Sequence, residues 1–230
     1  MYKLEDLSLD GLKIIQDDEL YKFTSDAVLL TKFAKVKSNE VVADFCAGSG
    51  IVGLHLYGLN KQKIKSVTMF EMQTPLFNMA IKSIELNNLQ SIFSGVNTRL
   101  QDIDKKFYGK FSLCICNPPY MPVDKNKTQN YTAIDLCKSE VALSMKELVI
   151  AINKVLKFGG RACLCHRADR LVELICLLNE NNLQPKRLQI VSAKNKKPYL
   201  VLVEAVKGGK SGVQILNEIQ NDAVTGNSYI

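Results

Sequence analysis

The stretch CNPPYMP, residues 116–122, places polar and aromatic groups directly after the apolar run FSLCIC. Its two consecutive prolines fix two φ angles and push the residues before them toward extended geometry. The loop is therefore stiff, and it holds the amide of Asn117 and the ring of Tyr120 at the end of a predicted buried strand. These groups offer a hydrogen-bond acceptor and a surface on which a planar group can stack.

Three other polar segments follow predicted strands. DFCAGSG, residues 44–50, leads from a strand into a helix, and Gly48 and Gly50 let the backbone approach a ligand closely. Glu71 ends the next strand, where a carboxylate can accept both hydroxyls of a ribose. Asp102 follows the third strand and can accept a hydrogen bond from an adenine amino group. Together they predict an adenosine ligand across three strand ends, with a plain tight turn and a dinucleotide fold as alternatives.

Strand-like and helix-like segments alternate from about residue 40 to residue 206. The predicted strands are 41–46, 64–71, 91–96, 111–116 and 161–166, followed by two strands within 186–206. Two of the predicted helices span 74–89 and 139–160, the second starting at the N-cap Ser139 and ending at its glycine pair. This alternation predicts an α/β fold with a mainly parallel seven-stranded sheet, a terminal antiparallel hairpin and helices on both faces.

We predict one domain with three parts. Residues 1–40 form an N-terminal accessory segment packed on the core, with a helix in KFTSDAVLLTKFA. Residues 41–206 form the core domain. Residues 207–230 are glycine-rich and then polar, and we expect a C-terminal tail that orders only partly.

The composition narrows the class of protein. The 230 residues carry 30 Lys and Arg against 23 Asp and Glu, a net charge of +7, which permits a polyanionic partner. We expect no membrane span and no signal peptide. The odd number of cysteines, seven, indicates reduced thiols and a cytoplasmic location. A zinc site built from the pairs Cys114/Cys116 and Cys163/Cys165 is an alternative, but small core residues are the favoured interpretation, so we expect no metal.

The segments DFCAGSG, FEMQ and CNPPY, in this order and spacing, resemble the class I S-adenosylmethionine-dependent methyltransferases, which have a Rossmann-like fold. The Asn-Pro-Pro-Tyr element resembles the branch that methylates amines. The resemblance implies that Asp44 and the glycines lie along the methionine part of the cofactor, Glu71 at its ribose and Asp102 at its adenine. The full set of implied cofactor-binding residues is Asp44, Cys46, Gly48, Gly50, Glu71, Met72, Asp102 and Asn117.

The resemblance also implies catalytic roles for Asn117, Pro118 and Tyr120. An exocyclic amine conjugated to a ring is a poor nucleophile. The side-chain oxygen of Asn117 and the carbonyl of Pro118 can accept its two hydrogens, so that the nitrogen lone pair turns toward the methyl group. Tyr120, with Pro119 beside it, offers a stacking surface worth roughly 1–3 kcal/mol.

The flanking sequences resemble the bacterial methyltransferases that act on N6 of adenine 37 in a valine tRNA. YKFTSDAVLLTKFA, KFGGRACLCHRADRL and the final hairpin with its KGG exit extend the resemblance over about residues 4–215. Ala168 and Asp169 depart from the usual Pro and Glu, and Cys46-Ala47 departs from the usual Gly-Thr. The implied partner is a tRNA anticodon arm, and the residues that would contact it are Arg161, His166, Arg167, Arg170, Lys194, Lys196 and Lys197.

Other substrates stay open. They are guanine N2 in rRNA, adenine N6 in DNA and a glutamine side chain in a protein. The glutamine branch usually carries a separate N-terminal helical domain, for which the first 40 residues are too few. A cofactor-binding protein that binds RNA without turnover is a further alternative, which the complete Asn-Pro-Pro-Tyr element disfavours. We expect a monomer.

Overall fold

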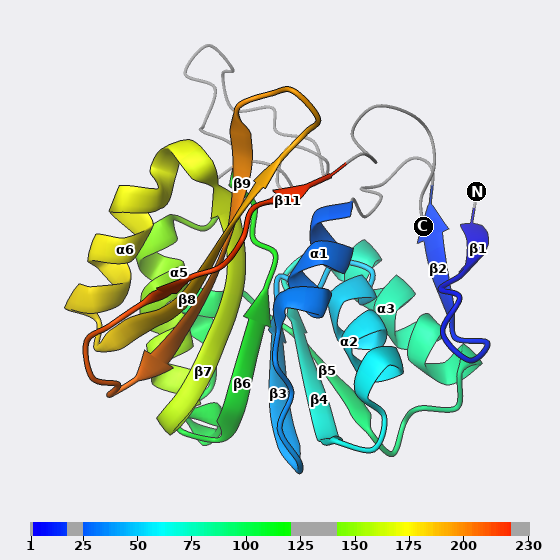
Figure 1. Cartoon of the computed structure of the whole chain (residues 1–230). Helices are drawn as coiled ribbons and strands as arrows, with labels where there is room; N and C mark the ends of the chain where they lie inside the picture. The colour runs from blue at the N-terminus through cyan, green and yellow to red at the C-terminus, as the bar shows by residue number, and fades with distance from the viewer. Residues whose placement is uncertain (1, 18–24, 121–141, 222–230) are drawn as a thin grey trace, which may run out of the picture.

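The structure is a computed structural model that describes residues 2–17, 25–120 and 142–221 (Figure 1). Its main element is a nine-stranded sheet. The strands of this sheet are β3 (Glu40–Phe45), β4 (Ile64–Glu71), β5 (Phe93–Asn97), β6 (Phe111–Cys116), β7 (Leu156–Arg167), β8 (Leu183–Ser192), β9 (Pro198–Lys207), β10 (Gln214–Ile215) and β11 (Ile219–Gln220). The helices are α1 (Ser25–Phe33), α2 (Ile51–Asn60), α3 (Thr74–Leu86), α5 (Met145–Val155) and α6 (Leu171–Glu180), with 3-10 turns η1 (Leu100–Asp102), η2 (Lys105–Phe107) and η3 (Ala168–Arg170).

The order of the strands across the sheet is β10-β8-β9-β7-β6-β3-β4-β5, and β11 also pairs with β8. From β5 to β7 every neighbouring pair is parallel, whereas β9 is antiparallel to both β7 and β8. The predicted α/β fold with a terminal antiparallel hairpin is therefore confirmed. The predicted number of seven strands is too low, because β10 and β11 also join the sheet beside β8. Because β3 lies between β4 and β6, the strand order reverses at β3, and ligands bind at such a point in open parallel sheets.

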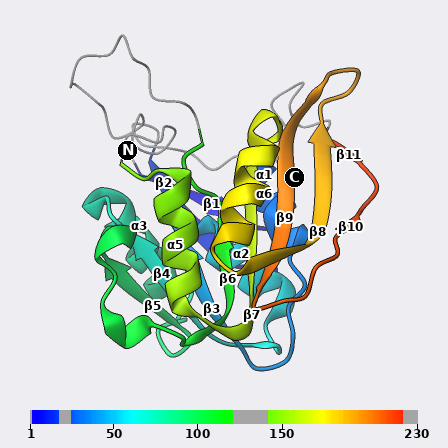
Figure 2. The ribbon, with the colours of Figure 1, turned by 90° about the vertical axis from the view of Figure 1, so that its left-hand side faces the viewer.

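Helices cover both faces of the sheet (Figures 1 and 2). On one face α5 and α6 pack through residues such as Leu148, Ile152 and Leu174. On the other, α1, α2 and α3 pack through residues such as Leu30, Leu54 and Ala80. Strands buried on both faces must be apolar throughout, which explains why they read as continuous hydrophobic runs rather than as alternating patterns.

The cysteine pairs of β6 and β7 belong to opposite faces. Cys114 and Cys116 lie in the core under α5 and α6, whereas Cys163 and Cys165 lie in the core under α1 and α2. In the register of the two strands Cys163 is opposite Ile115, one residue out of step with the other pair. This separation excludes a four-thiolate zinc site. The described residues contain no group of three or more His, Cys, Asp or Glu that could hold a metal.

The helix predicted over 139–160 is shorter in the structure. It begins at Met145, where Ser144 and Glu147 form a capping box, and the predicted N-cap Ser139 lies outside the described residues. It ends at Val155, because the chain continues directly into β7. The prediction that the glycine pair Gly159–Gly160 ends the helix is wrong, since both glycines lie inside the strand.

Two terminal segments add structure that the sequence did not indicate. Residues 2–17 contain a hairpin of β1 (Tyr2–Asp6) and β2 (Lys13–Asp17). The amide of Ile15 in β2 donates to Ser83 Oγ of α3 at 3.0 Å, which fastens the hairpin to that helix. At the other end, part of the segment predicted as a tail is strand, since β10 and β11 pair in parallel with β8 at the edge of the sheet. Within the described residues no helix has the length and apolarity to cross a membrane.

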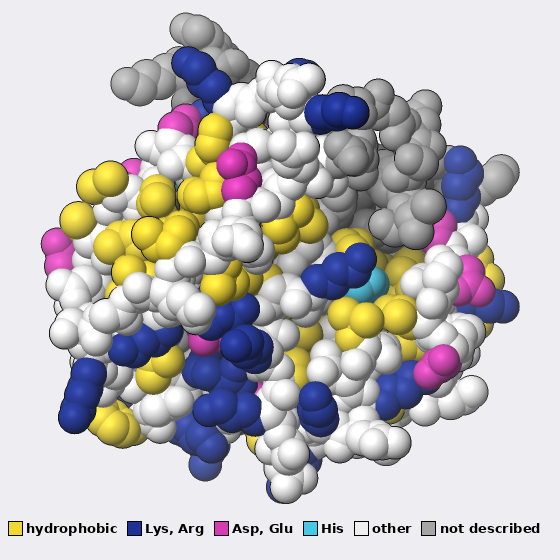
Figure 3. Space-filling view, viewed as in Figure 1, with side chains coloured by type: hydrophobic (Ala, Val, Ile, Leu, Met, Phe, Trp, Pro, Cys, Tyr) yellow, Lys and Arg dark blue, Asp and Glu magenta, His cyan; other side chains and the backbone are white. Residues whose placement is uncertain are grey.

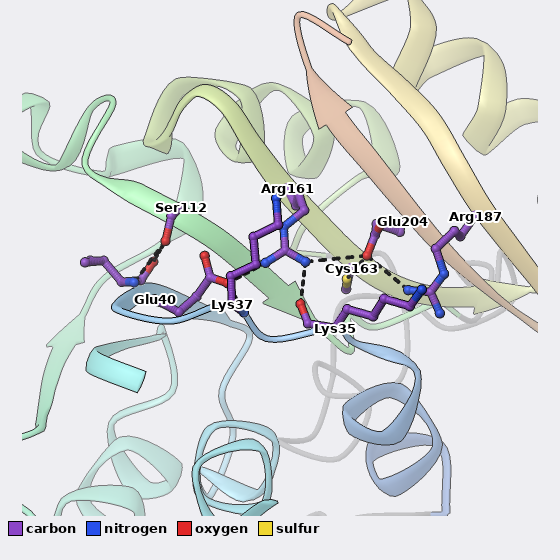
Figure 4. A network of polar contacts seen from close by, with 9 residues as sticks. Lys35, Lys37, Glu40, Ser112, Arg161, Cys163, Arg187 and Glu204 are labelled. Atoms are coloured by element: carbon purple, nitrogen blue, oxygen red, sulfur yellow. Dashed lines mark hydrogen bonds and ion pairs between the residues drawn. The ribbon is translucent and has the colours of Figure 1, made fainter. Parts of the chain in front are cut away.

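A buried ionic network fastens α1 to the sheet (Figure 4). Arg161 of β7 is 5% exposed and forms an ion pair with Glu40 at the start of β3. It also donates to the carbonyl of Lys35, in the segment after α1, and lies 3.7 Å from Glu204 of β9. Arg187 of β8 bonds Glu204 at 3.2 Å and donates to the carbonyl of Phe33, the last residue of α1. The prediction that Arg161 contacts RNA is therefore wrong, because this guanidinium is enclosed by its own protein.

We predict that Arg161→Ala lowers the free energy of unfolding by about 3–5 kcal/mol, because it leaves Glu40 buried without its cation. Urea unfolding measures this. The matched control is Lys61→Ala, whose ion pair with Asp10 at 3.1 Å is exposed and should contribute about 0–1 kcal/mol. Equal, small losses for the two variants would show that the network does not stabilise the fold.

Candidate active site

The register of the parallel strands brings five polar or sulfur-bearing residues into one row. Phe45 of β3 pairs with Phe70 of β4 and with Cys116 of β6, so the residues that follow on each strand are level with one another. Cys116 in turn pairs with Leu164 of β7. The row at the carboxyl ends of the strands is Asn97, Glu71, Cys46, Asn117 and Cys165.

The turn between β3 and α2 needs left-handed backbone at three positions. Cys46, Gly48 and Gly50 have φ values of 55°, 57° and 90°. A Cβ added at Gly50 would lie 3.2 Å from the sulfur of Met69 and 3.3 Å from the Cβ of Ala80, so this glycine permits close packing. A Cβ added at Gly48 would meet nothing within 4 Å. Gly48 therefore borders open space, which fits a turn that lies against a ligand.

Asp44 shapes this turn from beneath. Its side chain is fully buried, and its Oδ2 accepts a hydrogen bond from the amide of Gly53 in the first turn of α2, at 2.8 Å. A Cβ at Gly53 would lie 2.8 Å from the same oxygen, so only glycine leaves room for this carboxyl. Burial raises the pKa of Asp44 to about 8, the Gly53 amide opposes the rise, and the nearby Glu71 adds to it. Its Oδ1 has no hydrogen-bond partner in the part of the chain that the structure describes.

Glu71 joins the turn to the end of β4. One carboxylate oxygen accepts from the amide of Gly48 at 2.9 Å, and the other accepts from the amide of Gln73 at 2.7 Å. Burial raises the pKa of Glu71, while the backbone N–H groups of Gln73, Gly48 and Met72 lower it. Each oxygen keeps a further lone pair, so the same carboxylate can accept hydroxyl hydrogens of a sugar.

The other predicted cofactor residues lie at the same edge of the sheet. Met72 follows Glu71 and is 36% exposed. Asp102 is exposed in η1, the turn that follows β5. This connection is tied to β4, because the amide of Thr98 donates to the carbonyl of Glu71 at 3.1 Å. Glu71 at the end of β4 and Asp102 in the turn after β5 can therefore bind two ends of one elongated ligand.

The Asn-Pro-Pro-Tyr segment follows β6 directly. Pro118 is buried, and Asn117, Pro119 and Tyr120 are half-buried. The side-chain oxygen of Asn117 accepts from the thiol of Cys165 on β7 at 2.9 Å. Burial raises the pKa of Cys165 well above its ordinary value, so the thiol remains a hydrogen donor. It fixes the Asn117 amide and leaves the second lone pair of the oxygen for another donor.

Tyr120 is held by a residue that sequence reasoning missed. Its hydroxyl donates to the carboxylate of Asp26, in the first turn of α1, at 2.5 Å. Its ring centroid lies 5.9 Å from that of His166. His166 is only 1% exposed, so its position favours contact with Tyr120 over the predicted contact with RNA. In the sequence, only its place in the stretch YKFTSDAVLLTKFA pointed to Asp26. Its contact with Tyr120 joins residues 94 positions apart, so no local sequence pattern predicts it.

The remaining predicted RNA-binding residues fall into two groups. Arg167, the last residue of β7, and Arg170, in η3, are half-buried and form ion pairs with Asp169 and Glu173. Lys194, Lys196 and Lys197 are exposed in the turn between β8 and β9. Lys and Arg also gather over the lower part of β7 and β8 in Figure 3, the end of the sheet opposite to the carboxyl ends of the parallel strands.

We predict that Glu71→Gln weakens the binding of S-adenosylmethionine about 10- to 100-fold, the effect of losing a hydrogen bond to a charged acceptor. Isothermal titration calorimetry measures the Kd. Glu85→Gln is the control, because Glu85 is exposed on α3 and remote from the turn. An unchanged Kd for the Glu71 variant would remove Glu71 from the cofactor site.

Comparison with known proteins agrees with this geometry. Residues 24–161 match the family described as the methyltransferase small domain. A tRNA1(Val) (adenine(37)-N6)-methyltransferase of a Flavobacteriaceae bacterium is 26% identical over 201 residues, which cover 79% of this chain and 80% of the relative. A release factor glutamine methyltransferase of Clostridium botulinum is 27% identical over 154 residues, 64% of this chain and 53% of the relative.

Among solved structures, a predicted O-methyltransferase of Agrobacterium tumefaciens has the same fold, with a TM-score of 0.67 at 17% identity. The match covers 89% of this chain and 91% of that one. The family match spans more than half of the sequence and includes both the glycine turn and the Asn-Pro-Pro-Tyr segment. The chain therefore belongs to the methyltransferase small domain family and is an S-adenosylmethionine-dependent methyltransferase.

Proposed function

We propose that this enzyme methylates the exocyclic N6 amine of an adenine in tRNA, at position 37 of a valine tRNA, as a cytoplasmic monomer. The observation that carries the methylation of an amine is the placement of the Asn-Pro-Pro-Tyr segment level with the glycine turn of β3. The tRNA-modifying relative supports the substrate, because its similarity covers four-fifths of both chains.

The proposed cofactor site is formed by the ends of β3, β4 and β5. The turn at Cys46, Gly48 and Gly50 borders the methionine part, with Asp44 holding that turn in place. Glu71 accepts the ribose hydroxyls, while Met72 and Asp102 border the adenine. When bound, S-adenosylmethionine supplies an electrophilic methyl group on a positively charged sulfur.

The proposed catalytic segment acts by orientation. Asn117 Oδ1 and the carbonyl of Pro118 accept the two hydrogens of the adenine amine, which turns its lone pair toward the methyl group. The prolines fix both acceptors before the substrate arrives, so little reorganisation is needed in the transition state. Tyr120 stacks on the base. The amine loses its proton after transfer, and no side chain with a shifted pKa is required as a base.

The target adenine must leave its stack to reach Asn117. This costs least in a single-stranded loop, which suits an anticodon loop better than a duplex. Arg167 and Arg170 lie next to the site after β7, and Lys194, Lys196 and Lys197 project from the β8–β9 turn. We propose that these cations contact the phosphates of the anticodon arm.

A protein glutamine is the second candidate substrate. It is favoured by the similarity to the release factor glutamine methyltransferase, since an amide nitrogen could be held by the same two acceptors. That similarity covers 64% of this chain, against 79% for the tRNA-modifying relative. The wider match makes tRNA the preferred substrate.

The test is methyl transfer from labelled S-adenosylmethionine to total unmodified tRNA, followed by nucleoside digestion and mass spectrometry. Labelled N6-methyladenosine in a valine tRNA is the expected product. Release factor protein, rRNA and DNA are assayed in parallel. Label in one of these and none in tRNA would overturn the proposed substrate.

We predict that Asn117→Ala lowers kcat by roughly 10²–10³-fold, the scale for loss of one preorganised polar group. The Kd for S-adenosylmethionine should barely change. Asn78→Ala, an exposed position on α3, is the control. A near-normal kcat for Asn117→Ala would contradict the role given to the amide.

We predict that the double variant Lys196→Glu/Lys197→Glu weakens tRNA binding and lowers the slope of log Kd against log salt by about 1–2. The reason is that fewer counterions are released when two phosphate contacts are lost. Lys154→Glu/Lys157→Glu is the matched control, since these exposed lysines lie where α5 ends and β7 begins, at the far end of the sheet. Equal slopes for the two double variants would place the β8–β9 turn away from the RNA.

A further inference from the structure

The first turn of α1 reaches the catalytic segment. We propose that Asp26 is a positioning residue for methyl transfer, which fixes the ring of Tyr120 in the orientation that stacks on the substrate base. This inference rests on the function proposed above, because it assigns Tyr120 to the substrate. It makes the N-terminal segment a part of the active site rather than only a cover for the sheet.

The contact between the two side chains is short and shielded. Tyr120 Oη donates to Asp26 Oδ2 at 2.5 Å, and Asp26 is 6% exposed. Hydrogen bonds to an ionised acceptor are shorter and about twice as strong as neutral ones. The prolines before Tyr120 restrict the backbone, but they leave the side-chain torsions of the tyrosine unfixed. The bond at the tip of the ring supplies the missing restraint.

Asp26 can act as a fixed point only if α1 itself is held. Within the helix, Thr31 Oγ1 lies 2.7 Å from Nδ1 of His55 on α2, in a buried hydrogen bond. At its end, the carbonyl of Phe33 accepts from Arg187 at 3.2 Å, and the guanidinium lies 4.4 Å from the centre of the Phe33 ring. Arg161 holds the carbonyl of Lys35 just beyond (Figure 4). The helix is therefore anchored to the sheet at the end remote from Asp26.

The second oxygen of Asp26 faces β9 and the C-terminal segment. Tyr199 Oη lies 3.4 Å from Asp26 Oδ1, and Asn221 donates to Tyr199 Oη at 2.7 Å and to Ser25 Oγ at 2.9 Å. Burial is the main cause that raises the pKa of Tyr199 to about 12, and the charge of Asp26 adds to the rise. These contacts tie both terminal segments of the described chain to the carboxylate that holds Tyr120.

A double-mutant cycle tests the proposal, with Asp26→Asn, Tyr120→Phe and the combined variant. We expect each single variant to lower kcat about tenfold, and the combined variant to lose no more than Tyr120→Phe alone. The Kd for S-adenosylmethionine should stay at the wild-type value in all three. Lys32→Gln is the matched control, because Lys32 is exposed on the same helix and has no hydrogen bond to Asp26 or Tyr120 among the described residues.

A purely structural role for Asp26 gives a different pattern. The losses of Asp26→Asn and Tyr120→Phe would then multiply to about 100-fold in the combined variant, or the Asp26 variant would lose cofactor affinity together with activity. A wild-type kcat for Asp26→Asn would equally overturn the proposal. Asp26→Asn keeps the size of the side chain, and thermal unfolding of each variant shows whether the fold is retained.

The cycle is run on whichever acceptor the labelled-cofactor assay identifies. Label in a protein, in rRNA or in DNA would refute the tRNA assignment while the coupling between Asp26 and Tyr120 remains measurable. Label in tRNA combined with independent losses would refute the role of Asp26 while the proposed function stands.

Discussion

The parallel pairing of β3 with β4 and with β6 is the constraint on which the site depends. Parallel strands bring their carboxyl ends to the same edge, and the register sets which residues lie level there. The pairs Phe45–Phe70 and Phe45–Cys116 place Cys46, Glu71 and Asn117 in one row. A slip of one residue on β6 would exchange Leu113 and Ile115, which pack under α1 and α2, with the smaller Cys114 and Cys116, which pack under α5 and α6, so the packing of the two core faces favours the register of the site.

Burial of ionisable groups is the second physical theme of the molecule. At the site, Glu71 is buried and accepts two backbone amides, whereas Asp44 accepts one and burial raises its pKa to about 8. Near the middle of β7, Arg161 is buried among carboxylates and carbonyls that accept from its guanidinium. Buried ionic groups are tolerated when their hydrogen-bonding capacity is met, and removal of one partner is costly. The hydrogen bonds of Glu71 and Asp44 shape the turn between β3 and α2, and the ion pair and hydrogen bond of Arg161 anchor α1 to the sheet.

The anchoring of α1 connects the strand register at the site with the buried ionic network. A helix outside the parallel core contributes Asp26 to the substrate side of the site, and the ionic network at its far end keeps it there. The family match begins at residue 24, one residue before this helix starts. Shared fold and shared Asn-Pro-Pro-Tyr chemistry do not distinguish a tRNA from a protein glutamine, because the same two acceptors can orient either amine. We propose that selectivity comes from residues around the core, such as the β8–β9 turn.

The sequence by itself determined the elements whose signals are local. Apolar runs that end in DFCAGSG, FEMQ and CNPPY predicted strands β3, β4 and β6 and the polar residues at their ends. The glycines, prolines and polar residues of these segments can be recognised locally because the backbone geometry of the turns and the approach of a ligand require them. The ends of α5 were not predicted. The start was expected at Ser139, although Ser144 with Glu147 three residues later has the capping-box pattern, and Gly159–Gly160 lie in a strand instead of ending the helix. A glycine pair has the same local form in both settings.

Only the tertiary structure decided what the charged and aromatic side chains contact. Arg161 follows a glycine pair in a basic stretch and reads as a surface cation, yet β7 carries it into the core beside Glu40, 121 residues away. Asp26 reads as an ordinary first-turn acid, yet it holds Tyr120. The reason is that burial and pairing depend on segments distant in the chain, whereas propensity and periodicity depend only on near neighbours.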